Sequence, residues 1–377
     1  MNFSFDSGSL FAKLAITVPI VQAPMAGWAT PALAAAVSNS GALGSLGIGG
    51  MKAEDARAVI RETRSLTRRP FNVNVFCHRH AAADPAREAR WLAYLEPYFA
   101  RFQASPPAAL GNSYSSFVDD NAVLAMLLEE RPAVVSFHFG LPASTTIAAL
   151  HDAGIVLFAT ATNADEAGQV AHARIDAIVA QGAEAGGHRG TFDPAAPDEL
   201  LGTMALVRLL MRETSLPIIA AGGLMDGASI AAVLALGAQA AQLGTAFLVT
   251  PESAADAADR AALLNPRSRT ALTKAISGRL ARSVENAFTD IGRDPDCPPI
   301  SDFPIAFGAA RALNAAARAH GSSAFAAQWA GEAVRLSRAM PAAELVATLV
   351  QETVDAIASL RTGFGICSGP DTSGLDA

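Results

Sequence analysis

A glycine-rich segment with one histidine follows a short apolar stretch near the middle of the sequence. Residues 177–190 read Ala-Ile-Val-Ala-Gln-Gly-Ala-Glu-Ala-Gly-Gly-His-Arg-Gly, and the apolar part has the length of a buried parallel strand. Gly182, Gly186 and Gly187 allow the backbone to approach a ligand closely. His188 follows them and can exchange a proton near neutral pH. The segment therefore predicts a titratable group at the end of a strand.

Two further glycine-rich turns have the composition of a phosphate-binding site. They are Ala221-Gly222-Gly223 and Gln242-Leu243-Gly244-Thr245, and each follows an apolar stretch of strand length. Glycines leave backbone N–H groups accessible and Thr245 adds a hydroxyl, so both turns can bind a phosphate. The sequence therefore predicts a phosphorylated cofactor.

Other polar side chains near strand ends could bind the part of the cofactor that does not carry the phosphate. Asn74 and Gln181 carry uncharged amides that donate and accept hydrogen bonds, as the edge of a flavin ring requires. The turn Ala23-Pro24-Met25 ends the first apolar stretch, and His138 ends another. The carboxyl ends of all strands of a barrel meet at one face, so we expect these residues to share one site.

The elements that would position these residues alternate along the chain. Eight βα units favour a closed α/β fold, a (β/α)8 (TIM) barrel, because parallel strands need crossovers and a barrel leaves no open edge. An open doubly wound sheet is the alternative. The predicted strands are 19–25, 41–48, 70–76, 133–139, 155–160, 177–181, 216–221 and 240–244.

The barrel is expected to occupy residues 1–252, with a helical insertion after the third strand at about 84–131. The strand pattern stops after Pro251, so we expect residues 253–377 to form a C-terminal helical segment that packs on the barrel and partly covers it. Within it, residues 277–288 are expected to pass over the barrel mouth. The end of the chain, from residue 362, is expected to fray.

Composition excludes several classes of function. Lysine and arginine total 28 against 35 aspartate and glutamate, giving a net charge of −7, and no basic tract suggests nucleic acid as a partner. No apolar run approaches the length of a membrane span or signal peptide, so a cytoplasmic location is expected. Cys77, Cys297 and Cys367 are expected to be free thiols. The run from Cys77 to His80 lacks further ligands, so we expect no metal site.

Together these motifs resemble those of the nitronate monooxygenases, formerly called 2-nitropropane dioxygenases. The blocks at 72–78 and 136–140 are similar to those of the bacterial class I enzymes. The resemblance runs in order from about residue 19 to 252. The matching blocks are Gln22–Met25, Pro70–Asn74, Ser136–Gly140, Gln181–Gly190, Ala220–Gly223 with Asp226-Gly227, and Gln242–Phe247.

The resemblance implies an FMN enzyme that oxidises alkyl nitronates, with propionate 3-nitronate as the expected substrate. One-electron transfer to FMN and reaction with O2 would give a carbonyl compound and nitrite or nitrate, without metal or nicotinamide. His188 matches the family's active-site histidine. It would stabilise the anion if protonated, or act as a base toward neutral nitroalkanes. The expected FMN contacts are Ala23, Pro24, Met25, Asn74, Gln181, Gly186, Gly187, Gly222, Gly223, Gln242, Leu243, Gly244 and Thr245.

Several points remain open at the level of sequence. His138 and Arg189 are further candidates for substrate contact. Phe303, Phe307 and Arg311 stand where the family carries two tyrosines and a lysine, which predicts a more apolar pocket. The Glu-Ala-Gly-Gly-His block also occurs in NAD(P)H-dependent quinone and enoyl reductases, so such a reductase is the alternative. A phosphate-binding barrel without redox turnover is a third reading. A homodimer is compatible with the sequence, which does not fix the oligomeric state.

Overall fold

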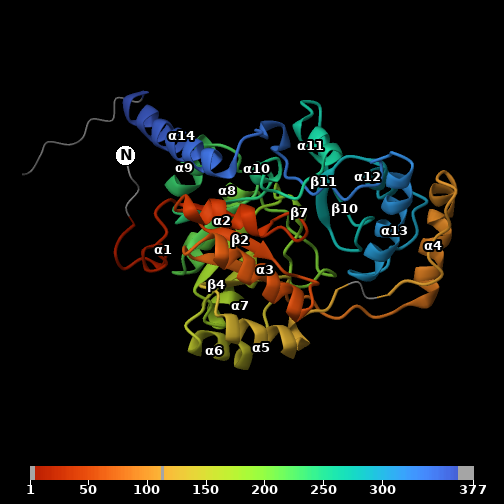
Figure 1. Ribbon diagram of the computed structural model, residues 1–377, viewed down its shortest axis with the longest axis horizontal. Coiled ribbons are helices and arrows are strands. Elements are labelled where there is room, and N and C mark those ends of the chain that lie inside the picture. Colours follow the sequence, from red (N-terminus) through yellow and green to blue (C-terminus); the bar gives the residue numbers. More distant parts are fainter. Residues whose placement is uncertain (1–4, 112–113, 364–377) are drawn as a thin grey trace, which may run out of the picture.

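Eight parallel strands close into a barrel in the computed structural model, which describes residues 5–111 and 114–363 (Figure 1). Closure depends on two backbone hydrogen bonds, from Gln22 N to Leu43 O at 2.9 Å and from Leu43 N to Ile20 O at 3.0 Å. In order around the barrel the strands are β1 (Ile20–Gln22), β9 (Ala240–Leu243), β8 (Ile218–Ala221), β6 (Ala177–Gln181), β5 (Val156–Ala161), β4 (Val134–His138), β3 (Phe71–Phe76) and β2 (Gly44–Gly47). The predicted barrel is confirmed, and the open sheet is excluded.

Helices cover the outside of the barrel. Their start signals are local: the Thr30 hydroxyl accepts a hydrogen bond from Leu33 N, and a proline occupies the first helical position. Amphipathic faces then bury leucine, isoleucine and valine against the strands. The helices are α2 (Pro31–Asn39), α3 (Ala53–Leu66), α5 (Asn121–Glu130), α6 (Ser144–Asp152), α7 (Ala164–His172), α8 (Thr203–Glu213), α9 (Gly227–Ala235) and α14 (Ala342–Gly363).

The inside of the barrel has a separate apolar core at its amino-terminal end. Phe158, Val179 and Ile219 meet there, and the short helix α1 (Leu10–Lys13) places Phe11 against them. Phe11 is fully buried, so this end of the barrel is closed by side chains. A ligand can therefore enter only from the opposite end, where the strands finish.

The predicted insertion at 84–131 divides into two parts. Helix α4 (Pro85–Ala100) packs on α13 (Ile305–Ala319), far from the barrel (Figure 1). Helix α5 instead packs between α3 and α6, in the place of the helix that connects β3 to β4. A short 3-10 helix, η1 (Phe117–Asp119), precedes α5. Only the first part therefore departs from the barrel.

The mostly helical segment expected after residue 252 also contains two strands. Strands β10 (Thr270–Thr273) and β11 (Ala281–Val284) pair antiparallel, and β11 also pairs with β7 (Gly187–His188). These strands are too short for a period-2 pattern to be visible, and β11 forms against a distant segment. The other elements are α10 (Thr245–Leu248), α11 (Ala257–Leu264), α12 (Ala287–Ile291) and the 3-10 helix η2 (Val334–Leu336).

The last helix, α14, belongs to the barrel layer. It packs on α9 and α2, and its Leu345, Val346 and Leu349 join the main core (Figure 1). The helix ring is thus completed about 100 residues after the last barrel strand. The division at residue 252 stays a prediction, and the expected fraying from residue 362 falls almost wholly outside the described residues.

A second apolar core lies beside the barrel. Trp91 and Phe99 of α4 pack with Phe288, Leu313 and Phe325, which come from the C-terminal part of the chain. We call α4, α12, α13, β10 and β11 the cap. Because its core is built from two distant segments, the cap is one packed unit over the mouth of the barrel.

Candidate active site

A cavity of about 620 Å³ lies between the carboxyl ends of the barrel strands and the cap. Nearly every residue predicted for the site lines it, whereas Arg189 and Leu243 do not. The predicted residues on its wall are Ala23, Pro24, Met25, Asn74, His138, Gln181, Gly186, Gly187, His188, Gly222, Gly223, Gln242, Gly244 and Thr245. The tertiary structure therefore gathers residues from six barrel strands and one cap sheet into a single site.

His188 lies where the barrel meets the cap. Its strand, β7, pairs with β11 of the cap, and its Nε2 is 2.8 Å from Ser277 Oγ. Aromatic rings surround the imidazole, with centroids 4.9 Å away for Trp329 and 5.2 Å for Phe303. Residues 277–288 thus approach the barrel mouth as expected, and they do so by pairing with the strand that carries His188.

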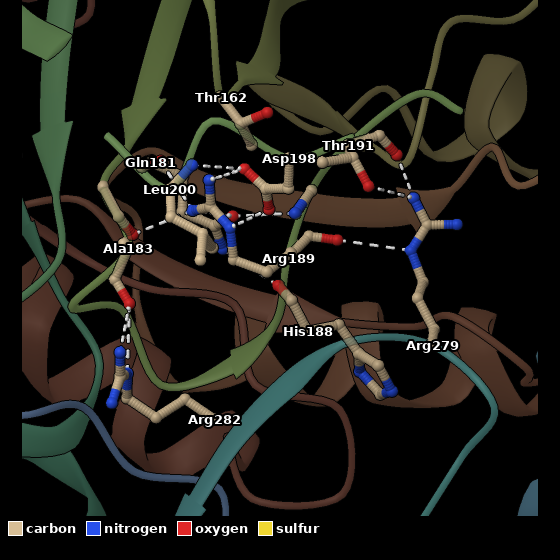
Figure 2. A network of polar contacts seen from close by, with 12 residues as sticks. Thr162, Gln181, Ala183, His188, Arg189, Thr191, Asp198, Leu200, Arg279 and Arg282 are labelled. Atoms are coloured by element: carbon tan, nitrogen blue, oxygen red, sulfur yellow. Dashed lines mark hydrogen bonds and ion pairs between the residues drawn. The ribbon is translucent and has the colours of Figure 1, made fainter. Parts of the chain in front are cut away.

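Three buried arginines hold the loop that carries His188 (Figure 2). Arg189 donates to the carbonyl oxygens of Gln181 and Gly182, both at 2.9 Å, and forms an ion pair with Asp198 at 2.8 Å. Arg279 Nε donates to the carbonyl of Arg189 at 3.2 Å. Arg282 donates to the carbonyl of Ala183 at 2.9 Å. Arg189 is thus a fully paired structural residue, and its position does not support contact with substrate.

The environment of His188 favours its neutral form. Burial, with the positive charge of Arg279 as the next cause, lowers the pKa of His188 to about 3. Arg279 stays charged at neutral pH although burial lowers its pKa to about 10, and its guanidinium lies 4.1 Å from the centre of the Phe139 ring. Of the two roles left open by the sequence, this environment matches the neutral histidine.

His138 has both ring nitrogens engaged by the protein. Its Nδ1 is 2.9 Å from Thr160 Oγ1, and its Nε2 is 3.3 Å from the backbone oxygen of His188. A carbonyl can only accept, so Nε2 carries the hydrogen and Nδ1 accepts from the threonine. Burial lowers the pKa of His138 to about 3. His138 therefore supports the backbone of His188, although it also lines the cavity.

Asn74 and Gln181, the two amides predicted to contact the edge of a flavin, differ in whether an amide oxygen is free to accept a hydrogen bond. Asn74 Nδ2 donates to Ser136 O at 3.1 Å and to Ser136 Oγ at 2.9 Å, so its Oδ1 remains available as an acceptor. Gln181 Nε2 donates to His188 O at 3.0 Å, and its Oε1 accepts from Gly190 N at 2.7 Å. Asn74 thus offers an oxygen to a ligand, whereas Gln181 mainly shapes the loop.

The two glycine-rich turns predicted to bind a phosphate have hydrogen-bond donors without a partner in the described part of the chain. Gly222 and Gly223 have φ of 123° and 70°, a conformation that strains other residues. In the described part of the chain, no acceptor lies within hydrogen-bond reach of the N–H groups of Gly223 and Leu224, which both line the cavity. Thr245 Oγ1 accepts from Gly331 N at 2.9 Å, so its own hydrogen can be donated elsewhere. This donor set suits a phosphate.

The cap side of the cavity is aromatic, with one cation. Tyr114 stacks on Phe303 and Phe307, with centroids 6.1 and 5.6 Å apart, and Arg311 lies beside them. Sequence reasoning identified Phe303, Phe307 and Arg311, but missed Trp28, Phe76, Tyr114, Thr160, Ser277, Trp329 and Gly331. Phe76 and Thr160 lie at the carboxyl ends of β3 and β5, a position that could have indicated them. No local pattern indicates the others, because they reach the site through the packing of the cap or of a barrel loop.

Residues 5–111 and 114–363 contain neither a metal-binding cluster nor a membrane-spanning helix. No group of three or more His, Cys, Asp or Glu side chains is placed to hold a metal ion. No helix in those ranges is long and apolar enough to cross a membrane. Cys77, the first residue of the Cys77–His80 run, is a buried thiol, and His80 pairs with Asp119.

Two solved structures share this fold over nearly the whole chain. The nitroalkane oxidase from Streptomyces ansochromogenes is 39% identical, with a TM-score of 0.83 over 93% of this chain and 100% of its own. FabK from Thermotoga maritima is 27% identical, with a TM-score of 0.71 over 94% of this chain and 98% of its own. The fold and the cavity thus define a barrel enzyme whose site lies under a cap.

Sequence comparison specifies the family. The profile described as Nitronate monooxygenase matches residues 8–352. Nitronate monooxygenases from Paraburkholderia phytofirmans and Pseudomonas aeruginosa are 60% and 56% identical, over 94% and 90% of this chain and 97% of each relative. The chain belongs to the nitronate monooxygenase family and is an oxidoreductase, and the general chemistry of that family is the flavin-dependent oxidation of nitronates.

Proposed function

We propose that the cavity binds FMN and that the enzyme uses O2 to oxidise alkyl nitronates to a carbonyl compound and nitrite or nitrate. The observation that carries the proposal is the set of free hydrogen-bonding groups on the cavity wall. Donors at Gly223, Leu224 and Thr245 fit a phosphate, and Asn74 Oδ1 fits a ring N–H. Bound FMN would supply the electron acceptor for the reaction.

The remaining residues suit an anionic substrate that is already deprotonated. A nitronate is a carbanion equivalent, so its oxidation requires a held anion and no proton transfer at the outset. The buried charge of Arg279 creates a positive field beside His188, and neutral His188 can donate or accept a hydrogen bond. The rings of Phe303 and Trp329 beside His188 lower the local dielectric constant, which strengthens both effects.

Propionate 3-nitronate is the substrate that we propose within this class. It carries a carboxylate in addition to the nitronate, and Arg311 is an exposed arginine on the cap side of the cavity. Phe303 and Phe307 would contact the short methylene chain between the two anionic groups. The family's tyrosine hydroxyls are absent at these two positions, so recognition of the carboxylate would depend more strongly on Arg311.

The purified protein tests this proposal directly. We expect the absorption bands of an oxidised flavin, release of FMN on denaturation, and loss of those bands when propionate 3-nitronate is added without oxygen. Admission of oxygen should restore the bands and produce nitrite or nitrate. Bands that disappear with NADH or NADPH but persist with the nitronate would establish the reductase alternative. A colourless protein that does not bind added FMN would refute the cofactor assignment.

A further inference from the structure

Thr203 contacts two loops of the site although it does not line the cavity. It is the first residue of α8 and is 3% exposed. Its hydroxyl oxygen, Oγ1, lies 2.9 Å from Glu184 Oε2 in the loop after β6 and 2.9 Å from the backbone oxygen of Gly222 in the turn after β8. Both partners are 19 positions away in the sequence, and Thr203 belongs to none of the motifs that the sequence analysis identified. It therefore joins the loop that leads to His188 with a turn predicted to bind a phosphate.

Glu184 caps the helix that begins with Thr203. The N–H of Thr203 donates to both carboxylate oxygens of Glu184, at 3.0 and 2.9 Å. The residue before the helix, Gly202, has no side chain for this purpose, and a negative charge is favoured at a helix N-terminus. A carboxylate of the protein thus engages the start of α8 and holds Thr203 in place. The donors that remain for a phosphate are those of the turns after β8 and β9.

The contact between Thr203 and Gly222 shows the direction of one peptide group. The carbonyl oxygen of Gly222 points at Thr203 Oγ1, and in a trans peptide the C=O and N–H bonds point in opposite directions. The N–H of the next residue, Gly223, therefore points away from α8 and toward the cavity that Gly223 lines. The hydroxyl has one hydrogen for two acceptors at 2.9 Å, but the direction of the peptide follows from the heavy atoms alone.

This peptide has little else to restrict its rotation. It joins two glycines, with φ of 123° and 70°, so no Cβ on either side limits the peptide plane. Thr203 packs closely on it, because a Cβ at Gly222 would lie 2.7 Å from Thr203 Oγ1. After rotation by half a turn, the peptide would present a carbonyl oxygen to the cavity in place of an N–H. That oxygen would repel a phosphate.

We propose that Thr203 is a positioning residue for the cofactor phosphate, because its hydroxyl holds the Gly222 carbonyl toward α8 and thereby presents the Gly223 N–H to the phosphate. The inference rests on the proposed function, since the phosphate is that of FMN. Thr203 itself does not touch the cofactor. Its hydroxyl acts on one end of the cofactor only, so its loss should weaken the hold on the phosphate and leave the contacts of the ring system unchanged.

Riboflavin, which is FMN without the phosphate, separates this role from a general structural one. The holoenzyme is equilibrated with mixtures of FMN and riboflavin, and the bound ratio gives the preference for FMN. Thr203→Val keeps the branched shape but removes the hydroxyl, so this preference should fall by about tenfold, as for loss of one hydrogen bond to a charged group. Thr203→Ser, which retains a hydroxyl, should restore most of it. Thr63→Val is the matched control, because Thr63 is also buried and its hydroxyl donates to Val59 O at 2.8 Å within α3.

Three outcomes of this competition would overturn the proposal. The first is an unchanged preference in Thr203→Val, which would make the hydroxyl merely structural. The second is an equal fall in Thr63→Val, and the third is an unmodified enzyme that binds both flavins equally. An unmodified enzyme that binds neither flavin would instead contradict the proposed function, and the inference would fall with it.

A second test observes the Gly223 N–H directly. The chain has three Gly-Gly pairs, at 49–50, 186–187 and 222–223, so glycine labelled with ¹³C at the carbonyl and with ¹⁵N leaves three candidate NMR signals. In the unmodified protein, the Gly223 amide proton should resonate further downfield with FMN than with riboflavin, because a phosphate oxygen accepts its hydrogen bond. Thr203→Val should remove most of this difference. Identical Gly223 signals with the two flavins in the unmodified protein would overturn the proposal.

Discussion

At the scale of single residues, some polar side chains of the site have an atom free to bind a ligand, and others form hydrogen bonds within the protein. His188 and Asn74 each keep one atom free on the cavity side, whereas His138, Gln181 and Arg189 are engaged by backbone groups. All five are polar and all belong to the family motifs. The hydrogen-bond partners of each side chain, and not its residue type, therefore decide whether it can bind a ligand or supports the backbone.

Substitution of Asn74 tests whether its free oxygen binds the cofactor, because Asn72 is a matched control on the same face of β3. We expect Asn74→Ala to weaken FMN binding by about 1–2 kcal/mol, the usual worth of one buried hydrogen bond. Asn72 is buried deeper, bonds to Ser45 and does not line the cavity, so Asn72→Ala should leave FMN affinity nearly unchanged. Titration of each apoprotein with FMN measures both effects, and equal losses would argue against a flavin contact at Asn74.

Arg311 should control recognition of a substrate carboxylate. Arg311→Met keeps much of the side-chain volume but removes the charge, so we expect KM for propionate 3-nitronate to rise by about tenfold or more, as for loss of a charge-assisted hydrogen bond. Propyl 1-nitronate lacks the carboxylate and serves as the control substrate. If KM rises equally for both nitronates, Arg311 does not bind the carboxylate.

At the scale of elements, the cap depends on one tight turn. A Cβ at Gly278 would collide with the Ser301 backbone, whereas Gly154 has a similar φ of 79° with no atom within 4 Å of its Cβ position. We expect Gly154→Ala to cost about 1 kcal/mol of unfolding free energy through backbone strain alone. Gly278→Ala should cost clearly more, roughly 2–4 kcal/mol, because the cap backbone must also move.

Denaturant unfolding of the two alanine variants, with FMN at a fixed excess, measures this difference. Gly278→Ala should also reduce turnover, since it displaces Ser277 from His188, while Gly154→Ala lies in a remote loop after α6. Comparable unfolding free energies for the two variants would show that the turn can relax and that the cap is less rigid than its contacts indicate.

At the scale of the whole molecule, three histidines with lowered pKa values couple the site to acid stability, and His78 is the most deeply buried of them. Burial is the first cause that lowers the pKa of His78 to about 4 and those of His138 and His188 to about 3. The unfolded chain would protonate all three near pH 6.5. Because the native pKa values are depressed, the stability that they contribute is fully present above pH 6.5 and is lost as pH falls toward 4 and 3.

We therefore expect the unfolding free energy of the holoenzyme to fall by roughly 2–4 kcal/mol between pH 7 and 5.5, after a discount for partial solvent exposure. Urea unfolding at several pH values provides the measurement. His78 lies outside the cavity wall against Phe303 and Phe139, so His78→Phe should weaken the pH dependence by about a third. A flat profile over this range would contradict the burial of neutral histidines.

The order of secondary structure was predictable because it depends on short-range chemistry. Apolar runs ended by glycine, and helices begun by Thr30-Pro31 or Asp226-Gly227, are encoded by neighbouring residues. Repetition of such units leaves few topologies, and the barrel is the one without an edge. The same logic placed Asn74, His138, His188 and the two glycine turns at one end of the barrel, where the cavity lies.

Contacts between segments that are distant in the sequence could not be predicted from the sequence, and only the structure shows them. Pairing of β7 with β11, the contact of Ser277 with His188, and the return of α14 to the barrel join segments that are about 90 or more residues apart. No local pattern encodes such contacts, since their energy is gained only when both partners are already folded. The sequence by itself thus determined the barrel, the family and most of the strand-end residues that line the cavity, and only the tertiary structure decided which cap residues join them and which of their atoms remain free.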